Sequence, residues 1–466
     1  MRVIILFILI LLDLGSMANV RLPSILSNHM VLQQKTNVII WGWCDPMETI
    51  KLFPGWDTIV YSTVGTNEAK WQIELSTPEA GGPYNIMIEA NQTVLIEDVM
   101  IGEVWLCGGQ SNMEFSGNHG IKQAIEESSK AANNNIRFFF TDKSTSNYPQ
   151  ENCSGEWRIC TPDEMMKFSA VGYFFGKELF DTLNIPIGLI NNNWAGTPAE
   201  VWTPSELIVN DSTLNLNKEK VWKSEEWWPT SPGVCYNAMI FPIVRFKLSG
   251  VIWYQGESNA DAFGSYKLLF STLIESWRAS WNLNFPFYFV QIAPFSGYQG
   301  KYTAALLREA QAECLALPNT GMVVIHDLID AIDAIHPQKK KEVGIRLAML
   351  ALADHYQKPL LSFKSPTFDS VLIKGNEAVI IFKDVVTGLK TNNGLAPDCF
   401  VVAGEDKFFY PANARIEDDK VIVSNFSTGR ISSVRFGFNN TDRPNLISNE
   451  GLPVASFRTD KWILIQ

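Results

Sequence analysis

The chain reads Val104-Trp105-Leu106-Cys107-Gly108-Gly109-Gln110-Ser111-Asn112-Met113 where an apolar run gives way to a short polar segment. An apolar run that ends in glycines and a small polar residue is typical of a buried strand turning sharply into a loop or helix. A serine at such a turn presents its hydroxyl at the carboxyl edge of a sheet, where open α/β folds bind ligands. Ser111 is therefore a candidate nucleophile. Met113 replaces the second glycine of a Gly-x-Ser-x-Gly elbow, so a plain polar loop is the alternative.

The composition of the whole chain limits the classes of function. Its 466 residues exceed one ordinary hydrophobic core, so two or three domains are expected. Apolar residues are plentiful and charge is modest, as in ordered globular proteins. The net charge of -11 argues against a nucleic-acid partner, because phosphate binding needs clustered Lys and Arg.

Residues 1–18 have the pattern of a signal peptide. Met1-Arg2 is a short basic start, an almost wholly apolar run follows, and Ser16-Met17-Ala18 places small residues where a signal peptidase cleaves. The apolar run is too short to span a bilayer, and no second long apolar stretch follows it. We therefore expect a secreted or periplasmic protein with no membrane partner after signal removal. A buried first strand is the alternative interpretation.

The seven cysteines are scattered and odd in number, which fits neither a disulfide framework nor a zinc pattern. Cys153 and Cys160 are the closest pair in sequence. One disulfide between them and buried free thiols are the two alternatives.

Three regions follow the signal peptide. Short alternating strands at 38–43, 49–53, 70–75, 84–88 and 93–96 predict a small β-sandwich in an N-terminal β domain, residues 19–100. In residues 101–358, strand candidates alternate with helix-length segments and predict a mainly parallel sheet covered by helices. These strands are 104–107, 136–140, 187–191, 250–254, 287–292 and 322–325, and the helices include 170–183, 266–277 and 340–353.

Residues 359–466 return to strands, so the fold class is α/β with β-sandwich-like regions at both ends. The C-terminal β region either pairs with the N-terminal sandwich or forms its own sandwich. Residues 210–232 contain Trp222, Trp227 and Trp228 but show no clear period. They form either a long loop near the site or a segment whose tryptophans pack into the core.

A serine nucleophile needs a base, and His336 has the best context among the five histidines. It follows a predicted strand and precedes Pro337, which suits the first turn of a helix. The helix dipole at that position disfavours imidazolium and keeps a neutral base available. Asp333, three residues earlier, is placed to hold the imidazole tautomer. His326 is the rival, and we interpret it as a histidine bonded by backbone.

Two further loops follow predicted strands and supply candidate oxyanion donors. The backbone N–H of Gly196 and the side-chain amide of Asn259 are placed to bind an oxyanion together with the N–H of Ser111. Gln110, Gln255 and Glu257 are candidates for binding substrate or orienting the histidine. All these loops lie after strands, so a parallel sheet brings them to one edge.

The order Ser…Gly…Asn…Asp-x-x-His resembles that of the SGNH, or GDSL-like, hydrolase superfamily. More closely, the chain resembles the sialate O-acetylesterase family. The segments that carry this resemblance are 22–33, 102–114, 236–240, 252–259 and 457–460, so it spans nearly the whole mature chain. The matching segments are long and occur in a fixed order, which makes the resemblance specific.

The resemblance implies that O-acetyl groups are removed from sialic acids, or a related acetylated glycan, without a metal or other cofactor. It also implies that Ser111 is the nucleophile, that His336 is the base, and that the loops of Gly196 and Asn259 supply the oxyanion donors. Relatives often have an acid two residues before the base, where this chain has Ala334. The third triad member is therefore Asp333, Glu257 or neither.

Two other functions remain as alternatives at this stage. An acetyl esterase for plant polysaccharide such as xylan would use the same site chemistry with a differently shaped pocket. A non-catalytic carbohydrate-binding protein would keep the aromatic-rich β regions and a dead hydrolase core.

Overall fold

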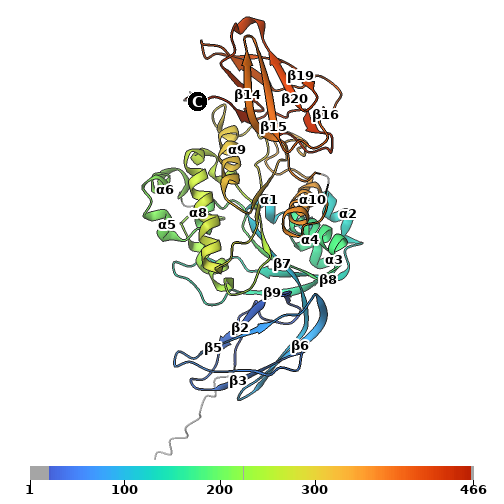
Figure 1. Ribbon diagram of the computed structural model, residues 1–466. Coiled ribbons are helices and arrows are strands. Elements are labelled where there is room, and N and C mark those ends of the chain that lie inside the picture. Colours follow the sequence, from blue (N-terminus) through green and yellow to red (C-terminus); the bar gives the residue numbers. More distant parts are fainter. Residues whose placement is uncertain (1–19, 224, 361, 463–466) are drawn as a thin grey trace, which may run out of the picture.

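The computed structural model describes residues 20–223, 225–360 and 362–462, so the predicted signal peptide lies outside the described residues and stays a prediction. The chain forms a central sheet with helices on both faces and a β region at each end (Figure 1). This confirms the predicted fold class. No helix in the described ranges has the length and apolar character needed to cross a membrane.

The N-terminal β region consists of two small sheets. Strands β2 and β5 pair antiparallel, and the second sheet joins the other strands to the first half of β7. Strand β5 alternates between buried and exposed residues, as expected for a strand with one face against a core. The strands of this region are β1 (Val31–Gln33), β2 (Asn37–Trp43), β3 (Thr49–Pro54), β4 (Tyr61–Val64), β5 (Lys70–Ser76) and β6 (Gly81–Glu89).

Strand β7 (Thr93–Gly109) links this region to the central sheet without a break. Its first half pairs antiparallel with β6, and its second half pairs parallel with β10 (Ile187–Asn193) and β11 (Gly250–Tyr254). The two short strands predicted at 93–96 and 104–107 are therefore one continuous strand. The boundary expected between residues 100 and 101 falls inside it.

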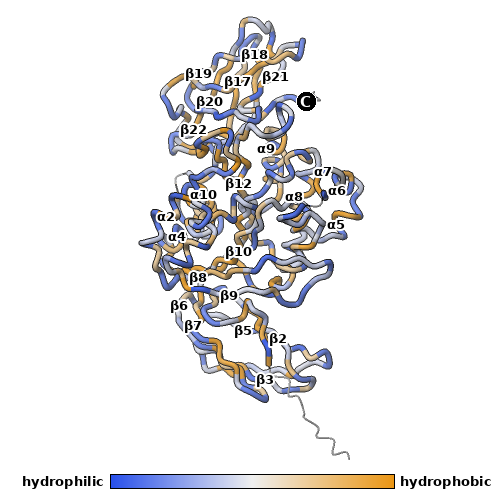
Figure 2. The backbone as a smooth tube through the Cα atoms, turned by 180° about the vertical axis from the view of Figure 1, so that it is seen from behind, coloured by the Kyte–Doolittle hydropathy of each residue, from blue (hydrophilic) through white to orange (hydrophobic). Residues whose placement is uncertain are grey.

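The central sheet has the order β13-β12-β11-β7-β10-β8-β9. All its neighbours are parallel except the edge strand β9, which was not predicted. The remaining strands of this sheet are β8 (Asn133–Thr141), β9 (Gly155–Cys160), β10 (Ile187–Asn193), β11 (Gly250–Tyr254), β12 (Phe287–Val290) and β13 (Thr320–Val323). Figure 2 shows hydrophobic residues in these strands, as expected for a sheet buried on both faces.

Helices cover the two faces, and alternate strand residues contact different helices. Trp105 and Cys107 belong to the apolar cluster that contains residues of α4 and α10, whereas Leu106 belongs to the cluster that contains Trp277 of α8. The helices are α1 (Ser111–Glu114), α2 (Lys122–Ser128), α3 (Pro162–Lys167), α4 (Ala170–Leu183), α5 (Ser205–Val209), α6 (Ser212–Asn215), α7 (Lys218–Val221), α8 (Phe263–Trp281), α9 (Thr303–Glu313) and α10 (Lys340–Leu350).

The C-terminal region forms its own sandwich at the end of the molecule opposite the N-terminal strands (Figure 1). Two four-stranded sheets have the orders β14-β15-β20-β19 and β18-β17-β21-β23, and β16 pairs with β22. The strands are β14 (Thr367–Lys374), β15 (Glu377–Lys383), β16 (Leu389–Thr391), β17 (Phe400–Ala403), β18 (Phe409–Pro411), β19 (Asn413–Glu417), β20 (Lys420–Ser424), β21 (Ser433–Phe436), β22 (Leu446–Ser448) and β23 (Phe457–Arg458).

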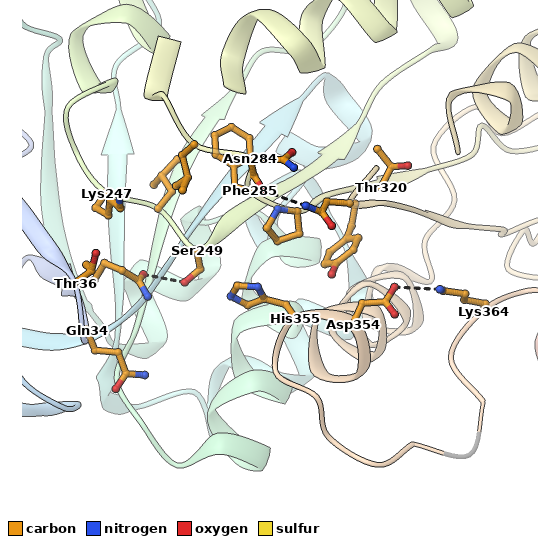
Figure 3. Close-up of a pocket in the computed structure, with 16 residues that line it drawn as sticks. Gln34, Thr36, Lys247, Ser249, Asn284, Phe285, Thr320, Asp354, His355 and Lys364 are labelled. Carbon is orange, nitrogen blue, oxygen red and sulfur yellow. Dashed lines mark hydrogen bonds and ion pairs between the residues drawn. The ribbon is translucent and has the colours of Figure 1, made fainter. Parts of the chain in front are cut away.

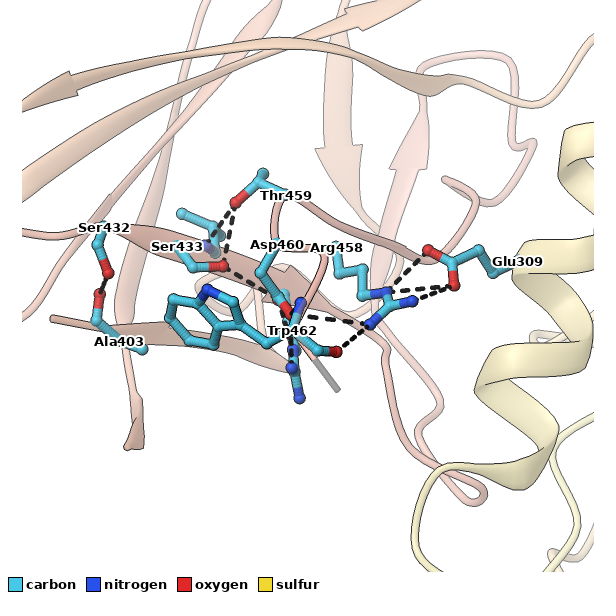
Figure 4. Close-up of polar contacts among 10 residues, drawn as sticks. Glu309, Ala403, Ser432, Ser433, Arg458, Thr459, Asp460 and Trp462 are labelled. Carbon is cyan, nitrogen blue, oxygen red and sulfur yellow. Dashed lines mark hydrogen bonds and ion pairs between the residues drawn. The ribbon is translucent and has the colours of Figure 1, made fainter. Parts of the chain in front are cut away.

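Arginine–carboxylate pairs hold this sandwich together and fasten it to the central part. Arg458 of β23 donates to Glu309 of α9 at 2.8 Å (Figure 4). Arg435 donates to both oxygens of Asp460 at 2.8 Å. The Arg435 and Asp460 side chains are almost fully buried. Bidentate pairs of this kind fix geometry as well as charge.

All seven cysteines are free thiols, so the disulfide alternative for Cys153 and Cys160 is not formed. The segment 210–232 contains the short helices α6 and α7 and serves both roles considered for it. Trp222 packs against the core, whereas the ring of Trp228 lies against Gly196.

Candidate active site

The candidate nucleophile, Ser111, lies at the carboxyl end of the central strand of the sheet. Strand β7 lies between β10 and β11, and Gly109 at its end pairs with Asn193 on one side and Tyr254 on the other. Gly109 has φ +136°, and a Cβ there would lie 2.2 Å from the carbonyl oxygen of Tyr254. Only glycine permits this close turn. Ser111 then begins α1 at the crevice where the strand order reverses, the usual ligand site of such sheets.

The structure brings His336 to this serine. The Nε2 atom of His336 lies 2.9 Å from the Oγ of Ser111, although 225 residues separate them. The ring of Phe115 packs against the imidazole with ring centres 4.5 Å apart. This geometry lets the serine hydroxyl donate to a neutral imidazole, the arrangement that a nucleophile and its base require.

The surroundings of His336 differ from the expected helix amino end. Helix α10 begins at Lys340, and Pro337 is not in its first turn. Burial, followed by the charge of Lys340, lowers the pKa of His336 to about 4. The predicted direction holds because a neutral base is favoured, but desolvation is its main cause and not the helix dipole.

Asp333 does not hold the imidazole. Its side chain is exposed, and no side-chain hydrogen bond joins it to His336 among the described residues. The carboxylate of Glu257 also misses the imidazole, because it is buried and accepts the amide of Asn112 at 2.6 Å. These contacts correct the expectation that Asp333 orients the base, and they leave Ser111 and His336 as a dyad.

We therefore expect Asp333→Asn to leave kcat/KM within about threefold of the unchanged enzyme, because substitutions at exposed positions that make no specific contact have small effects. A triad acid replaced by its amide would instead lower kcat by about ten-thousandfold. Steady-state hydrolysis of an aryl acetate measures the difference. A loss above a hundredfold would show that Asp333 moves to His336 during turnover.

Two backbone N–H groups are available to bind an oxyanion. Neither Ser111 nor Gly196 donates its N–H to a backbone or side-chain acceptor within the described ranges. Gly196 has φ +79°, and a Cβ there would overlap the ring of Trp228 at 2.2 Å. The loop is fastened by Glu114, which accepts the N–H of Ala195 at 2.6 Å, and by the Ser258 hydroxyl, which donates to the Gly196 carbonyl at 2.9 Å.

The amide of Asn259 has a different role from the predicted one. Its Nδ2 donates to Glu200 at 2.8 Å, and its Oδ1 accepts the N–H of Ala199 at 2.9 Å. Burial raises the pKa of Glu200 to about 7. The hydrogen bonds of Asn259 therefore connect the loop after β11 to the loop after β10. This corrects its assignment as an oxyanion donor.

The two glutamines also contact protein. Gln255 is fully buried. Its Nε2 donates to the Oδ1 of Asn259 at 2.8 Å, and its Oε1 accepts the hydroxyl of Tyr266 at 2.9 Å. This corrects its candidacy for binding substrate. Gln110 accepts the N–H groups of Gly256 and Ser258, each at 3.3 Å, through its Oε1. It orients the loop after β11 and not the histidine.

The rival histidine is structural. His326 is buried, and its Nε2 lies 3.0 Å from the carbonyl oxygen of Val454. Burial lowers its pKa to about 4. This confirms its interpretation as a histidine bonded by backbone.

Comparisons with known proteins identify the family of the chain. The family model described as carbohydrate esterase, sialic acid-specific acetylesterase matches residues 101–353. The chain belongs to this family. It is therefore a carboxylic ester hydrolase, and the family implies acetylated sialic acid or acetylated glycan as substrate. The family resemblance seen in the sequence is confirmed.

Individual relatives match most of this esterase. The sialate O-acetylesterase of Mus musculus is 31% identical over 407 residues, covering 74% of this chain and 75% of the relative. That of Rattus norvegicus is 28% identical over 490 residues, covering 91% and 90%. The crystal structure of a carbohydrate acetylesterase from Xanthomonas citri is similar with a TM-score of 0.87, 35% identity, and coverage of 95% of this chain and 100% of that one.

Sequence reasoning missed two residues of the esterase that lie behind the dyad. Asn112 is fully buried beside the nucleophile, and the Nζ of Lys340 donates to its Oδ1 at 2.5 Å. Asn112 stood within the motif, and Lys340 follows His336 by four residues, but no local pattern indicates that their side chains meet.

A separate cavity of about 560 Å³ lies near the amino ends of β11 and β12 (Figure 3). This edge of the sheet is opposite the edge that carries Ser111. Ser249 and Pro286, which line it, directly precede strands β11 and β12, whereas Ser111 follows the carboxyl end of β7. Its described lining includes none of the predicted site residues. In the described part of the esterase, no group of three His, Cys, Asp or Glu side chains is arranged to hold a metal ion.

Proposed function

We propose that this esterase removes O-acetyl groups from sialic acids through an acetyl-enzyme intermediate on Ser111. The observation that carries the proposal is the 2.9 Å contact between His336 Nε2 and Ser111 Oγ at the crevice of the sheet. Sialic acid as the sugar is supported by sialate O-acetylesterase relatives that align with most of the chain.

The first half of the reaction transfers the acetyl group to the enzyme. His336 Nε2 takes the proton of Ser111 as Oγ bonds to the acetyl carbonyl carbon, and the carbonyl electrons move to oxygen. The N–H groups of Ser111 and Gly196 bind this oxyanion. The bond from carbon to the sugar oxygen then breaks, and the imidazolium returns the proton to the leaving sugar hydroxyl.

The second half restores the serine. Water loses a proton to His336 while its oxygen bonds to the acetyl carbon. The tetrahedral intermediate collapses, Oγ leaves and recovers the proton, and acetate is released. A neutral imidazole is needed at the start of each half. The lowered pKa of His336 supplies it at every pH well above about 4.

The substrate is tested by acetate release from O-acetylated sialic acid, acetylated xylan and an aryl acetate under the same conditions. We expect kcat/KM for the sialic acid ester to exceed that for acetyl-xylan by more than about tenfold, which is a difference of 1.4 kcal/mol in transition-state binding. Ser111→Ala serves as the blank for spontaneous hydrolysis. A preference for acetyl-xylan would retain the esterase mechanism and reject sialic acid as the substrate.

A further inference from the structure

A buried amide joins the nucleophile segment to the base segment. Asn112 lies next to Ser111 on α1, and it is fully buried. Its Nδ2 donates to Glu257 Oε1 at 2.6 Å and to the carbonyl oxygen of Ile335 at 3.1 Å, while its Oδ1 accepts from Lys340 Nζ at 2.5 Å. The Asn112 side chain therefore connects α1 to three other segments. They are the loop after β11, the loop that carries His336 (the base loop) and the start of α10.

The bond to Ile335 bears directly on the base. The carbonyl of Ile335 belongs to the peptide unit that leads into His336, so this bond fixes the backbone from which the imidazole projects. Asn112 directly follows Ser111, so the same bond sets the base relative to the nucleophile. In a triad, a carboxylate on the second ring nitrogen does this work. No described carboxylate contacts the imidazole here.

Lys340 and Glu257 fix which way the amide faces. The ammonium of Lys340 has only donors, so it selects the amide oxygen. The Oε1 of Glu257 and the carbonyl of Ile335 accept, so they select the amide nitrogen. A flipped amide would set oxygen against two acceptors and nitrogen against a cation.

Burying these ionisable groups has a cost. Both the Lys340 and the Glu257 side chains are buried, and desolvation is the main cause that lowers the pKa of Lys340 to about 7 and raises that of Glu257. Buried charges are costly unless paired and hydrogen-bonded. Lys340 also lies over the Tyr254 ring, 5.1 Å from its centre. Retaining such groups directly behind the dyad is explained if they set its geometry.

We infer that Asn112, oriented by Lys340 and Glu257, is the positioning residue that holds His336 against Ser111 in place of a triad carboxylate. This inference rests on the proposed serine mechanism. It assigns no contact with substrate to Asn112, and it makes the main chain of Ile335, not the imidazole ring, the point where the base is held.

The first test combines Asn112→Ala with His336→Ala. We expect Asn112→Ala to lower kcat for an aryl acetate by about a hundredfold with KM nearly unchanged, because a small misplacement of a catalytic group has this effect. In the His336→Ala background the same change should have less than about a twofold effect, because residues that act as a unit are not additive.

The matched control is Asn192→Ala. Asn192 is also a fully buried asparagine, and it donates to a backbone carbonyl, that of Met239, at 2.9 Å without touching the base loop. A merely structural role for Asn112 predicts equal, additive losses for both asparagine variants. Loss in the His336→Ala background as large as in the parent would overturn the inference. Full activity of Ser111→Ala would instead reject the serine mechanism.

The second test uses the pH dependence of kcat/KM and does not require Asn112→Ala to fold. The titratable groups on the segments around His336 include Lys340 on α10, Glu257 after β11, and Glu114 with His119 beside α1. The loop that carries His336 also holds Asp330, Asp333 and Lys339. The Lys340 cation lowers the pKa of His336. Removing it in Lys340→Met should therefore raise the acid limb from about pH 4 toward the ordinary histidine value and lower the plateau.

Lys339→Met is the control for this second test, because Lys339 is partly exposed and pairs with Asp330 at 3.9 Å. Its acid limb should stay at that of the unchanged enzyme. An acid limb and a plateau that Lys340→Met leaves unmoved would overturn the inference, since the cation would then neither reach the base nor orient Asn112.

Discussion

Replacing Ser111 by alanine should lower kcat/KM for an acetyl ester by about four to six orders of magnitude, the loss typical of a missing nucleophile. Only the hydroxyl is removed and no larger group has to fit at this buried residue, so the fold should survive the change. The proposed oxyanion donors, the N–H groups of residue 111 and of Gly196, belong to the backbone and remain. A small residual rate above that of water is therefore expected.

Two measurements accompany Ser111→Ala. A serine-directed organophosphonate should label the unchanged enzyme once per chain and should fail to label the variant. The Ser128→Ala variant removes another hydroxyl, one that donates to the carbonyl of Ile125 on α2, and it should keep its labelling. Hydrolysis by Ser111→Ala at the rate of the unchanged enzyme would contradict the serine mechanism.

Replacing His336 by alanine should lower kcat by a similar factor, because residues that act as a unit each remove nearly the whole effect. The physical reason is the 2.9 Å contact with Ser111, through which the hydroxyl proton can pass to the imidazole. Organophosphonate labelling should also slow strongly, since it needs the same activated oxygen.

His119→Ala is the matched control for His336→Ala. The ring of His119 stacks on Phe115 at 5.0 Å, and Phe115 in turn contacts His336, so both histidines border the same aromatic ring. His119 bonds to Ser116 and not to Ser111. We expect His119→Ala to change kcat less than about threefold, as for an exposed position. Comparable losses in the two variants would remove His336 from the role of base.

In the proposed dyad no carboxylate within the described residues bonds His336, although the family resemblance implies an acid where this chain has Ala334. The exposed Asp333 does not replace it, and Glu257 bonds Asn112. Base strength is also low, because burial lowers the pKa of His336 to about 4. A base with a low pKa is available in its neutral form, but it has less driving force for taking the serine proton. Its position relative to Ser111 therefore matters greatly.

Local patterns were enough to predict the elements that carry the site. Apolar runs of strand length indicated β7 and β10, whose ends lead into Ser111 and the Gly196 loop. The βαβ rhythm then implied parallel strands, whose carboxyl ends share one edge. The predicted start of the helix after His336, at residue 340, is confirmed, whereas the short edge strand β9 was missed and Pro337 lies outside the first turn of that helix.

The sequence by itself determined the fold class and the family, and it singled out Ser111 and His336 as candidates. Each of these depends on short-range periodicity or on the order of short sequence motifs. Only the tertiary structure decided which partner each polar side chain takes. Asn259 bonds Glu200 and Asn112 bonds Lys340 across 59 and 228 residues. Those pairings depend on which buried groups packing brings within 3 Å, since a desolvated donor or acceptor must find a partner where it lies. No spacing along the chain encodes that distance.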